Sequence, residues 1–148
     1  MEGDKVLADV VKKALFLFDG RLVSVVLFGS RARGTAHFHS DFDLLIVARA
    51  LPDEEGRDKL ALDIAEIGFE YGLSLQIILT TLEETLLSAK TGAPLMFEIY
   101  DAHRIIYDKE GVFGYVIQEF AEQLHRWKAR KIKDRVWEVP GLAVSRLQ

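Results

Sequence analysis

Two apolar runs separated by a short polar connection constrain the fold of this chain more than any other feature. The first run, Leu22–Phe28, is rich in β-branched residues, and the second, Asp41–Ala48, is apolar throughout from Leu44 to Val47. Both are predicted to be strands of a buried sheet. The connection between Gly29 and Asp41 is too short for a full crossover helix, so the two strands are expected to run antiparallel.

The rest of the pattern surrounds these strands with helices. Apolar residues at helical spacing predict a first helix that ends at Asp19-Gly20. The elements predicted after the second strand are a helix from Pro52 to Gly72, a strand at Leu73–Thr80, a short helix capped by Thr80 or Thr81, another short helix from Pro94, an edge strand at His103–Tyr107 and a long helix after Gly111. This order predicts an α+β fold, a small mixed sheet with helices packed mainly on one face.

Composition excludes several classes of protein. The chain has 148 residues, a net charge of -4 and no cysteine, so disulfides, zinc-thiolate sites and cysteine nucleophiles are excluded. No apolar run reaches the length of a membrane span, and the N-terminus is not typical of a signal peptide. We therefore expect a cytoplasmic protein with no membrane partner. A single domain is predicted over residues 1–148, with a core over about 1–108 and a C-terminal helix and tail over 109–148.

The connection after the first strand has the composition of an anion-binding turn. Gly29 has no side chain to block a ligand, Ser30 offers a hydroxyl and an N–H, and Gly34 lets the chain turn back. Arg31 and Arg33 stand where a guanidinium group could bind phosphate oxygens. The connection is not a Walker loop, because no Gly-Lys-Ser/Thr closes it. A plain glycine-rich connection is the alternative interpretation.

Two acidic residues open the second strand. Asp41 and Asp43 are one residue apart, so their side chains share a face of the strand and lie ~6–7 Å apart along it. Carboxylates in this arrangement can bind hard divalent cations, which phosphoryl chemistry uses. The alternative is that both face water at a sheet edge. The combination with the Gly29-Ser30 turn favours a functional site.

The run GSRARG followed by SDFDLLIV resembles the signature of the DNA polymerase β-like nucleotidyltransferase superfamily, and its minimal members in particular. The resemblance implies a polymerase β palm-like fold plus a C-terminal helix. It also implies that Asp41 and Asp43 are catalytic and coordinate Mg²⁺ or Mn²⁺. A nucleoside triphosphate, expected to be ATP, would be bound by Gly29, Ser30, Arg31, Arg33, Gly34 and Ser40.

One position departs from that signature. Active members of the superfamily usually carry a third carboxylate on a later strand, and the residue that aligns there is Gln76, with Ser74 on the same face. Glutamine carries no charge and accepts no proton at neutral pH. Glu66 and Glu70 are nearby in the sequence, although a solvated helix face is the favoured interpretation for both. Nucleotide binding is therefore predicted more securely than turnover.

Three further features have alternative interpretations. His37 and His39 alternate with the two aspartates and could add transition-metal ligands if the strand began early. The basic segment His125–Arg135 is expected to be a solvated helix end, with a docking face for RNA or an acidic partner as the disfavoured alternative. The aromatic residues expected in the core or at a homodimer contact are Phe97, Tyr100 and Tyr107.

The leading hypothesis is a Mg²⁺-dependent nucleotidyltransferase that moves an NMP group from an NTP to a hydroxyl of a protein, RNA or small molecule. Members of the family often pair with a small helical protein, and some act as antitoxins, so the resemblance implies such a partner. The second hypothesis is a catalytically weak NTP-binding regulatory or antitoxin subunit, which Gln76 favours.

Overall fold

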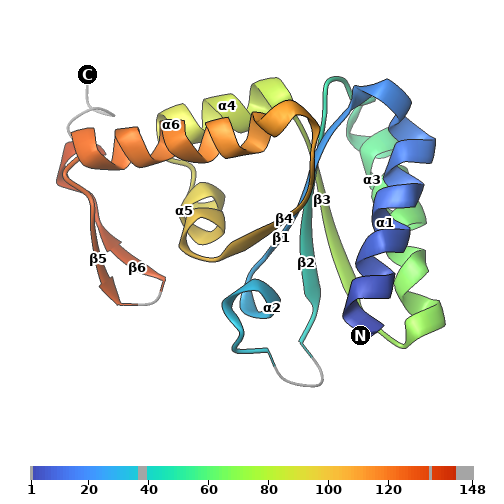
Figure 1. Ribbon diagram of the computed structural model, residues 1–148. Helices are drawn as coiled ribbons and strands as arrows, with labels where there is room; N and C mark the ends of the chain where they lie inside the picture. Colours follow the sequence, from blue (N-terminus) through green and yellow to red (C-terminus); the bar gives the residue numbers. More distant parts are fainter. Residues whose placement is uncertain (1, 37–39, 134, 143–148) are drawn as a thin grey trace.

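The computed structural model describes residues 2–36, 40–133 and 135–142. Figure 1 shows its helices and strands around one central sheet. The elements are α1 (Glu2–Phe18), η1 (Asp19–Arg21), β1 (Leu22–Phe28), α2 (Ser30–Arg33), β2 (Phe42–Ala48), α3 (Glu54–Ala65), η2 (Glu66–Tyr71), β3 (Leu75–Thr81), α4 (Leu82–Thr91), α5 (Pro94–Asp101), β4 (His103–Asp108), η3 (Lys109–Gly111), α6 (Val112–Arg126), β5 (Arg130–Lys133) and β6 (Val136–Glu138).

The central sheet has the strand order β3-β2-β1-β4. Strand β1 runs antiparallel to β2 and to β4, whereas β2 and β3 run parallel, so the sheet is mixed. This arrangement confirms the α+β prediction and the antiparallel pairing of the first two strands. The predicted edge strand is β4, which lies at one end of the sheet.

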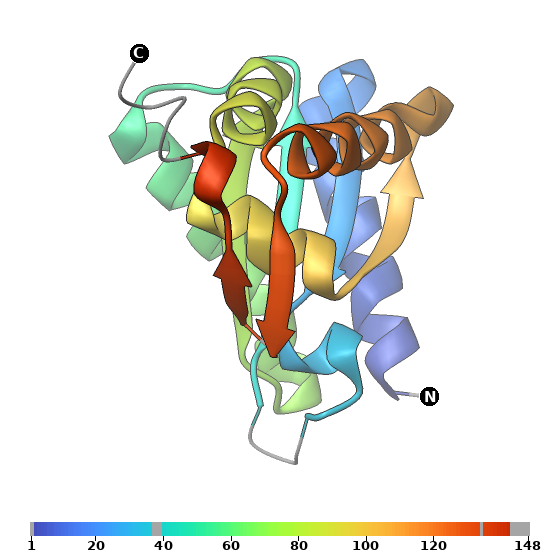
Figure 2. The same cartoon turned by 90° about the vertical axis from the view of Figure 1, so that its left-hand side faces the viewer.

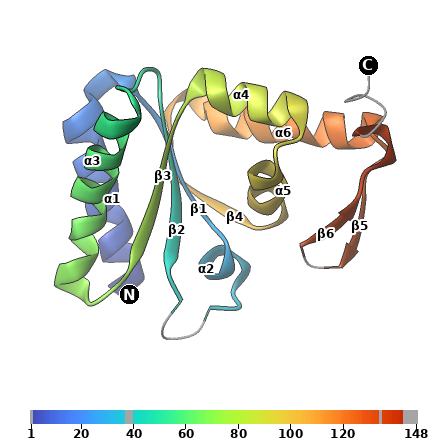
Figure 3. The ribbon, with the colours of Figure 1, turned by 180° about the vertical axis from the view of Figure 1, so that it is seen from behind.

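Helices cover both faces of the sheet, which differs from the prediction that they gather mainly on one face. Figures 1 and 3 show α1 and α3 on one side and α4, α5 and α6 on the other. The reason lies in β2, whose side chains alternate between two apolar clusters. Leu44 and Ile46 pack in the α1 cluster, whereas Leu45 and Val47 pack with Ile99 of α5. A strand that is apolar on both sides needs cover on both sides.

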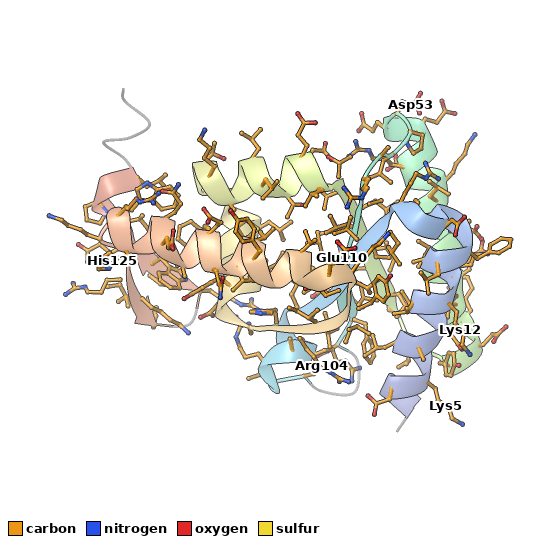
Figure 4. All side chains as sticks on the ribbon, turned by 45° about the horizontal axis from the view of Figure 1, so that its top comes forward. Lys5, Lys12, Asp53, Arg104, Glu110 and His125 are labelled. Carbon is orange, nitrogen blue, oxygen red and sulfur yellow. The ribbon has the colours of Figure 1, made fainter. Side chains whose placement is uncertain are left out.

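The helices bury the stripes that the sequence predicts. On α6 the buried side chains are Phe113, Val116, Phe120 and Leu124, followed by Trp127 just after the helix. In Figure 4, Lys5 and Lys12 lie on the outer side of α1, and both are exposed. Within the described residues, no helix combines the length and the apolar character that crossing a bilayer requires.

The chain after α6 folds differently from the prediction. The basic segment was expected to continue as a helix end, but α6 ends at Arg126 and β5 pairs with β6 in an antiparallel hairpin. The ring of Trp137 on β6 packs edge-on against Phe97 and Tyr100 of α5, with centroids 5.6 and 6.2 Å apart. Figure 2 shows this hairpin in front of α5, on the α4–α6 side of the sheet. Aromatic packing therefore fixes the hairpin beside α5.

Candidate active site

The turn after β1 brings the backbone of Gly29 against the side chain of Asp43. Gly29 has a φ of 76°, in the left-handed region that favours glycine. A Cβ atom at this position would overlap the Oδ2 atom of Asp43, so only glycine fits between the turn and the carboxylate. Ser30 follows as the first residue of α2 and is half-buried. Because the first N–H groups of a helix have no acceptor within it, they can meet a ligand here.

The two aspartates lie at the same end of β2. Asp43 pairs with Phe28 on β1 and with Gln76 on β3, and alternation along β2 places it on the face covered by α5. Asp41 precedes the strand and is exposed. Burial raises the pKa of Asp43 above its ordinary value, and the charges of Glu98 and Asp41 add to the increase, while Arg135 acts in the opposite direction. The carboxylates of Asp41 and Asp43 therefore share one electrostatic field.

The donor set fits a hard divalent cation. Each carboxylate offers oxygen ligands, and their mutual repulsion is offset when a cation lies between them. Mg²⁺ is commonly held by one or two protein carboxylates together with substrate phosphates rather than by an all-protein cage. Among the described residues, no group of three or more acidic or histidine side chains is arranged to hold a metal. The pair of aspartates would thus depend on ligand oxygens to complete the coordination.

The position predicted for a third carboxylate is occupied by Gln76. In the parallel pairing of β2 and β3, Gln76 lies directly beside Asp43 and on the same face of the sheet. Glu66 and Glu70 lie in η2 and are exposed. Their neighbours Ile67 and Tyr71 pack in the α1 cluster, so η2 covers the opposite face of the sheet. Neither glutamate can replace the missing group from there.

Arg31 binds the protein rather than facing Asp43. Its Nε and Nη2 atoms donate to the carbonyl oxygen of Ser40, at 3.2 and 2.8 Å. Its guanidinium carbon lies 4.3 Å from the centroid of the Phe42 ring, which belongs to the α1 cluster. The phosphate contact expected of Arg31 stays a prediction. Arg31 fixes the two ends of the connection between α2 and β2.

Arg33 makes a second internal contact. Its Nη2 atom lies 2.8 Å from Oδ2 of Asp101, whose side chain is only 4% exposed. The ammonium group of Lys131 on β5 binds the other carboxylate oxygen of Asp101. Gly34 ends α2 with a φ of 80° and donates its N–H to the carbonyl oxygen of Ser30 at 3.0 Å. Asp101 therefore joins the turn after β1, through Arg33, to the C-terminal hairpin.

Comparison with known proteins decides the family. The family model described as a nucleotidyltransferase domain matches residues 7–138. The chain belongs to the nucleotidyltransferase domain family. The mixed sheet agrees with the fold that the resemblance in the sequence implies, and the roles of the Gly29-Ser30 turn and of the aspartate pair stay predictions.

Relatives of this nucleotidyltransferase domain are found among sequences and structures. A protein of Methanocaldococcus jannaschii, MJ1305, described as a candidate protein adenylyltransferase, is 33% identical over 142 residues, which cover 94% of this chain and 95% of the relative. A chain in the crystal structure of a tri-AMPylated Shewanella oneidensis HEPN toxin with its MNT antitoxin matches with a TM-score of 0.56 and 16% identity, over 85% of this chain and 88% of that chain. A chain of a toxin–antitoxin complex with AMP-PNP matches with a TM-score of 0.55 and 20% identity, over 81% and 89% of the two chains.

Three residues near the site of this nucleotidyltransferase domain were not predicted from the sequence. Glu98 and Asp101 lie on α5, and Arg135 lies in the hairpin turn. Glu98 and Asp101 are three residues apart and share a face of α5. Only the fold brings the charge of Glu98 close enough to act on Asp43 and joins Asp101 to Arg33 of α2. Arg135 ends the basic segment that the sequence singled out, but the sequence did not connect it with this site, because the hairpin was not predicted.

The remaining predictions have different outcomes. His37 and His39 lie outside the described residues, so the transition-metal alternative stays a prediction. Phe97 and Tyr100 pack edge-on against Phe120 of α6, with centroids 5.1 and 5.6 Å apart, which gives them a role in the core. The homodimer stays a prediction.

Proposed function

We propose that the chain is a Mg²⁺-dependent nucleotidyltransferase that transfers AMP from ATP to a hydroxyl group of a protein partner. One observation carries this proposal: the backbone of Gly29 lies against the carboxylate of Asp43, and the negative charge of Asp41 is close enough to raise the pKa of Asp43. The choice of AMP as the transferred group and of a protein as the acceptor is supported by the similarity to MJ1305, a candidate protein adenylyltransferase, and by the AMPylated toxin in the complex that contains a structurally similar chain. A small helical protein is the acceptor we favour.

The position of each residue in the site indicates its role in the proposed reaction. Asp41 and Asp43 would hold Mg²⁺, or Mn²⁺ in its place, and the ion would neutralise charge on the phosphates. Gly29 lets the turn lie against the carboxylate of Asp43, and the first amides of α2, beginning at Ser30, would donate to the oxygens of the phosphate chain. In the reaction, the acceptor oxygen bonds to the α-phosphorus, the bond to pyrophosphate breaks, and the hydroxyl proton is released. The rate enhancement would come from positioning the two reactants and from neutralising charge on the phosphates.

Labelling with ATP, GTP, CTP and UTP carrying ³²P at the α-phosphate tests this proposal. We expect transfer of label from ATP, in the presence of Mg²⁺ or Mn²⁺, to a protease-sensitive acceptor in extracts of the source cells. Transfer should fall by at least about 100-fold in Asp41→Asn and Asp43→Asn, because each variant removes a charge that holds the cation. Asp58→Asn is the matched control, since Asp58 is an exposed residue of α3, on the opposite face of the sheet. Label in an RNase-sensitive product would contradict the choice of a protein acceptor.

A second candidate function is an NTP-binding regulatory or antitoxin subunit with little turnover. The position of Gln76 beside Asp43 favours it, because no carboxylate stands where the superfamily usually places the third one. This candidate predicts that Mg²⁺ and ATP raise the melting temperature of the chain while no label is transferred to any acceptor. Loss of that stabilisation in Asp43→Asn would separate site-specific binding from a general effect of the nucleotide.

A further inference from the structure

The β5–β6 hairpin is held at the site by two independent contacts. Trp137 packs against the aromatic rings of α5, and Lys131 binds the buried carboxylate of Asp101. The same carboxylate binds Arg33 of α2, which begins at the phosphate-binding turn. Figures 1 and 3 show the adjoining ends of β5 and β6 at the height of α2, on the side of the sheet that carries α5. The two strands of the hairpin therefore have a defined position relative to α2 and α5.

The hairpin turn presents an arginine to this site. Arg135 stands in the two-residue connection between Lys133 and Val136. It lines a cavity of about 210 Å³ together with Glu98, Asp101 and Trp137. Its charge acts on Asp43, the residue on which the turn after β1 closes. The guanidinium group thus lies within electrostatic reach of Asp43 and shares a cavity with Glu98, whose charge also acts on Asp43.

Charge balance shows what this arginine can do. Asp41, Asp43 and Glu98 are three carboxylates in one field, and a nucleoside triphosphate would add further negative charge. Arg31 is bound to Ser40, and Arg33 and Lys131 are both bound to Asp101. Within the described part of the chain, Arg135 makes no salt bridge and no side-chain hydrogen bond. Among the cations that the structure describes at this site, Arg135 is the one whose donors are available to an incoming anion.

The backbone of Arg135 supports a functional reason for its presence. Its φ is 65°, in the left-handed region where glycine or asparagine is the usual choice for a tight turn. A residue with a long side chain is disfavoured there, and such positions concentrate at ligand-binding sites. The cavity wall also carries the indole of Trp137, whose buried Nε1 atom has no hydrogen-bond partner among the described residues.

We propose that Arg135 binds the phosphate chain of the nucleotide, so that the C-terminal hairpin is part of the active site. The proposal rests on the nucleotide-binding function proposed above. It assigns to the hairpin the charge-neutralising role that the sequence alone suggested for Arg31 and Arg33. Arg135, which ends the basic segment of the tail, would then serve the nucleotide rather than an RNA partner.

The variant Arg135→Gly provides a clean test, because glycine accepts the positive φ and the hairpin should fold at least as well as in the wild type. Equilibrium dialysis with radiolabelled ATP and Mg²⁺ gives the dissociation constant, and competition with unlabelled pyrophosphate isolates the phosphate contact. We expect the affinity for both ligands to fall by about tenfold or more, since a charge-assisted contact is lost. Lys133→Ala, which removes an exposed positive charge from the same hairpin, should change both by less than about twofold.

Three results would overturn the inference. Unchanged ATP affinity in Arg135→Gly, with tight binding by the wild type, would remove Arg135 from the site and leave the proposed function intact. Weaker ATP binding with unchanged pyrophosphate binding would place the contact at the base or ribose. Absence of ATP binding by the wild-type chain would overturn the proposed function and this inference together.

Discussion

At the scale of single residues, Asp43 carries an energetic cost in the absence of a ligand. Its carboxylate is partly buried, faces Glu98 and Asp41, and lies against the backbone of Gly29. Burial and the charges of Glu98 and Asp41 disfavour the charged form of Asp43, and the backbone of Gly29 leaves its carboxylate no space to turn away. Such arrangements are typical of functional sites, where a group is held in a state that its ligand stabilises. The cost can therefore be measured as a stability gain when the charge is removed.

Asp43→Asn should be more stable than the wild type at pH 7 without metal or nucleotide. The pKa of Asp43 is raised in the folded state, so the folded chain binds the proton more tightly than the unfolded chain. Its ionisation therefore lowers stability as the pH rises through the folded-state pKa, and this effect is absent below the ordinary aspartate pKa. We expect a melting temperature higher by a few degrees at pH 7 and a difference near zero at a pH below about 3.5. Equal stability of the two proteins at both pH values would contradict this assignment.

At the scale of elements, Asp101 connects three parts of the chain. It ends α5 and binds both Arg33 of α2 and Lys131 of β5. Burial alone would raise the pKa of Asp101, but the hydrogen bonds from Lys131 and Arg33 outweigh burial and hold it below the ordinary value. A buried carboxylate with two cationic partners fixes the elements that carry them, because removing its charge takes the same buried anion from both cations.

Asp101→Asn should destabilise the fold and loosen the hairpin. At pH 7 we expect the free energy of unfolding in urea to fall by about 2 kcal/mol, with faster amide exchange in β5 and β6. Because the pKa is lowered in the folded state, the stability that Asp101 contributes is present above the ordinary aspartate pKa and is lost as the pH falls through the folded-state value. Glu122→Gln is the control, since Glu122 forms an exposed pair with Arg126. Equal effects of the two substitutions on the free energy of unfolding and on amide exchange would show that the contacts of Asp101 do not hold the hairpin in place.

At the scale of the whole molecule, local sequence patterns predicted the helices that bury an apolar stripe and the strands that are formed by an apolar run. They also predicted the Gly29-Ser30 turn and its neighbour Asp43, because these are close along the chain and joined by one antiparallel pair. The second layer of helices was missed, since an apolar strand does not indicate which helix covers which face. Glu98 and Arg135 reach the site only through packing of α5 and of the hairpin, which sequence spacing does not encode.

The most direct measurement is a crystal structure of the chain with Mn²⁺ and AMP-PNP, in which anomalous scattering locates the ion. We predict that the ion is coordinated by both Asp41 and Asp43 and by phosphate oxygens, with the phosphate chain against the amides of the Gly29-Ser30 turn. An ion and nucleotide bound elsewhere, or phosphates that avoid this turn, would contradict the claim that these groups form one site.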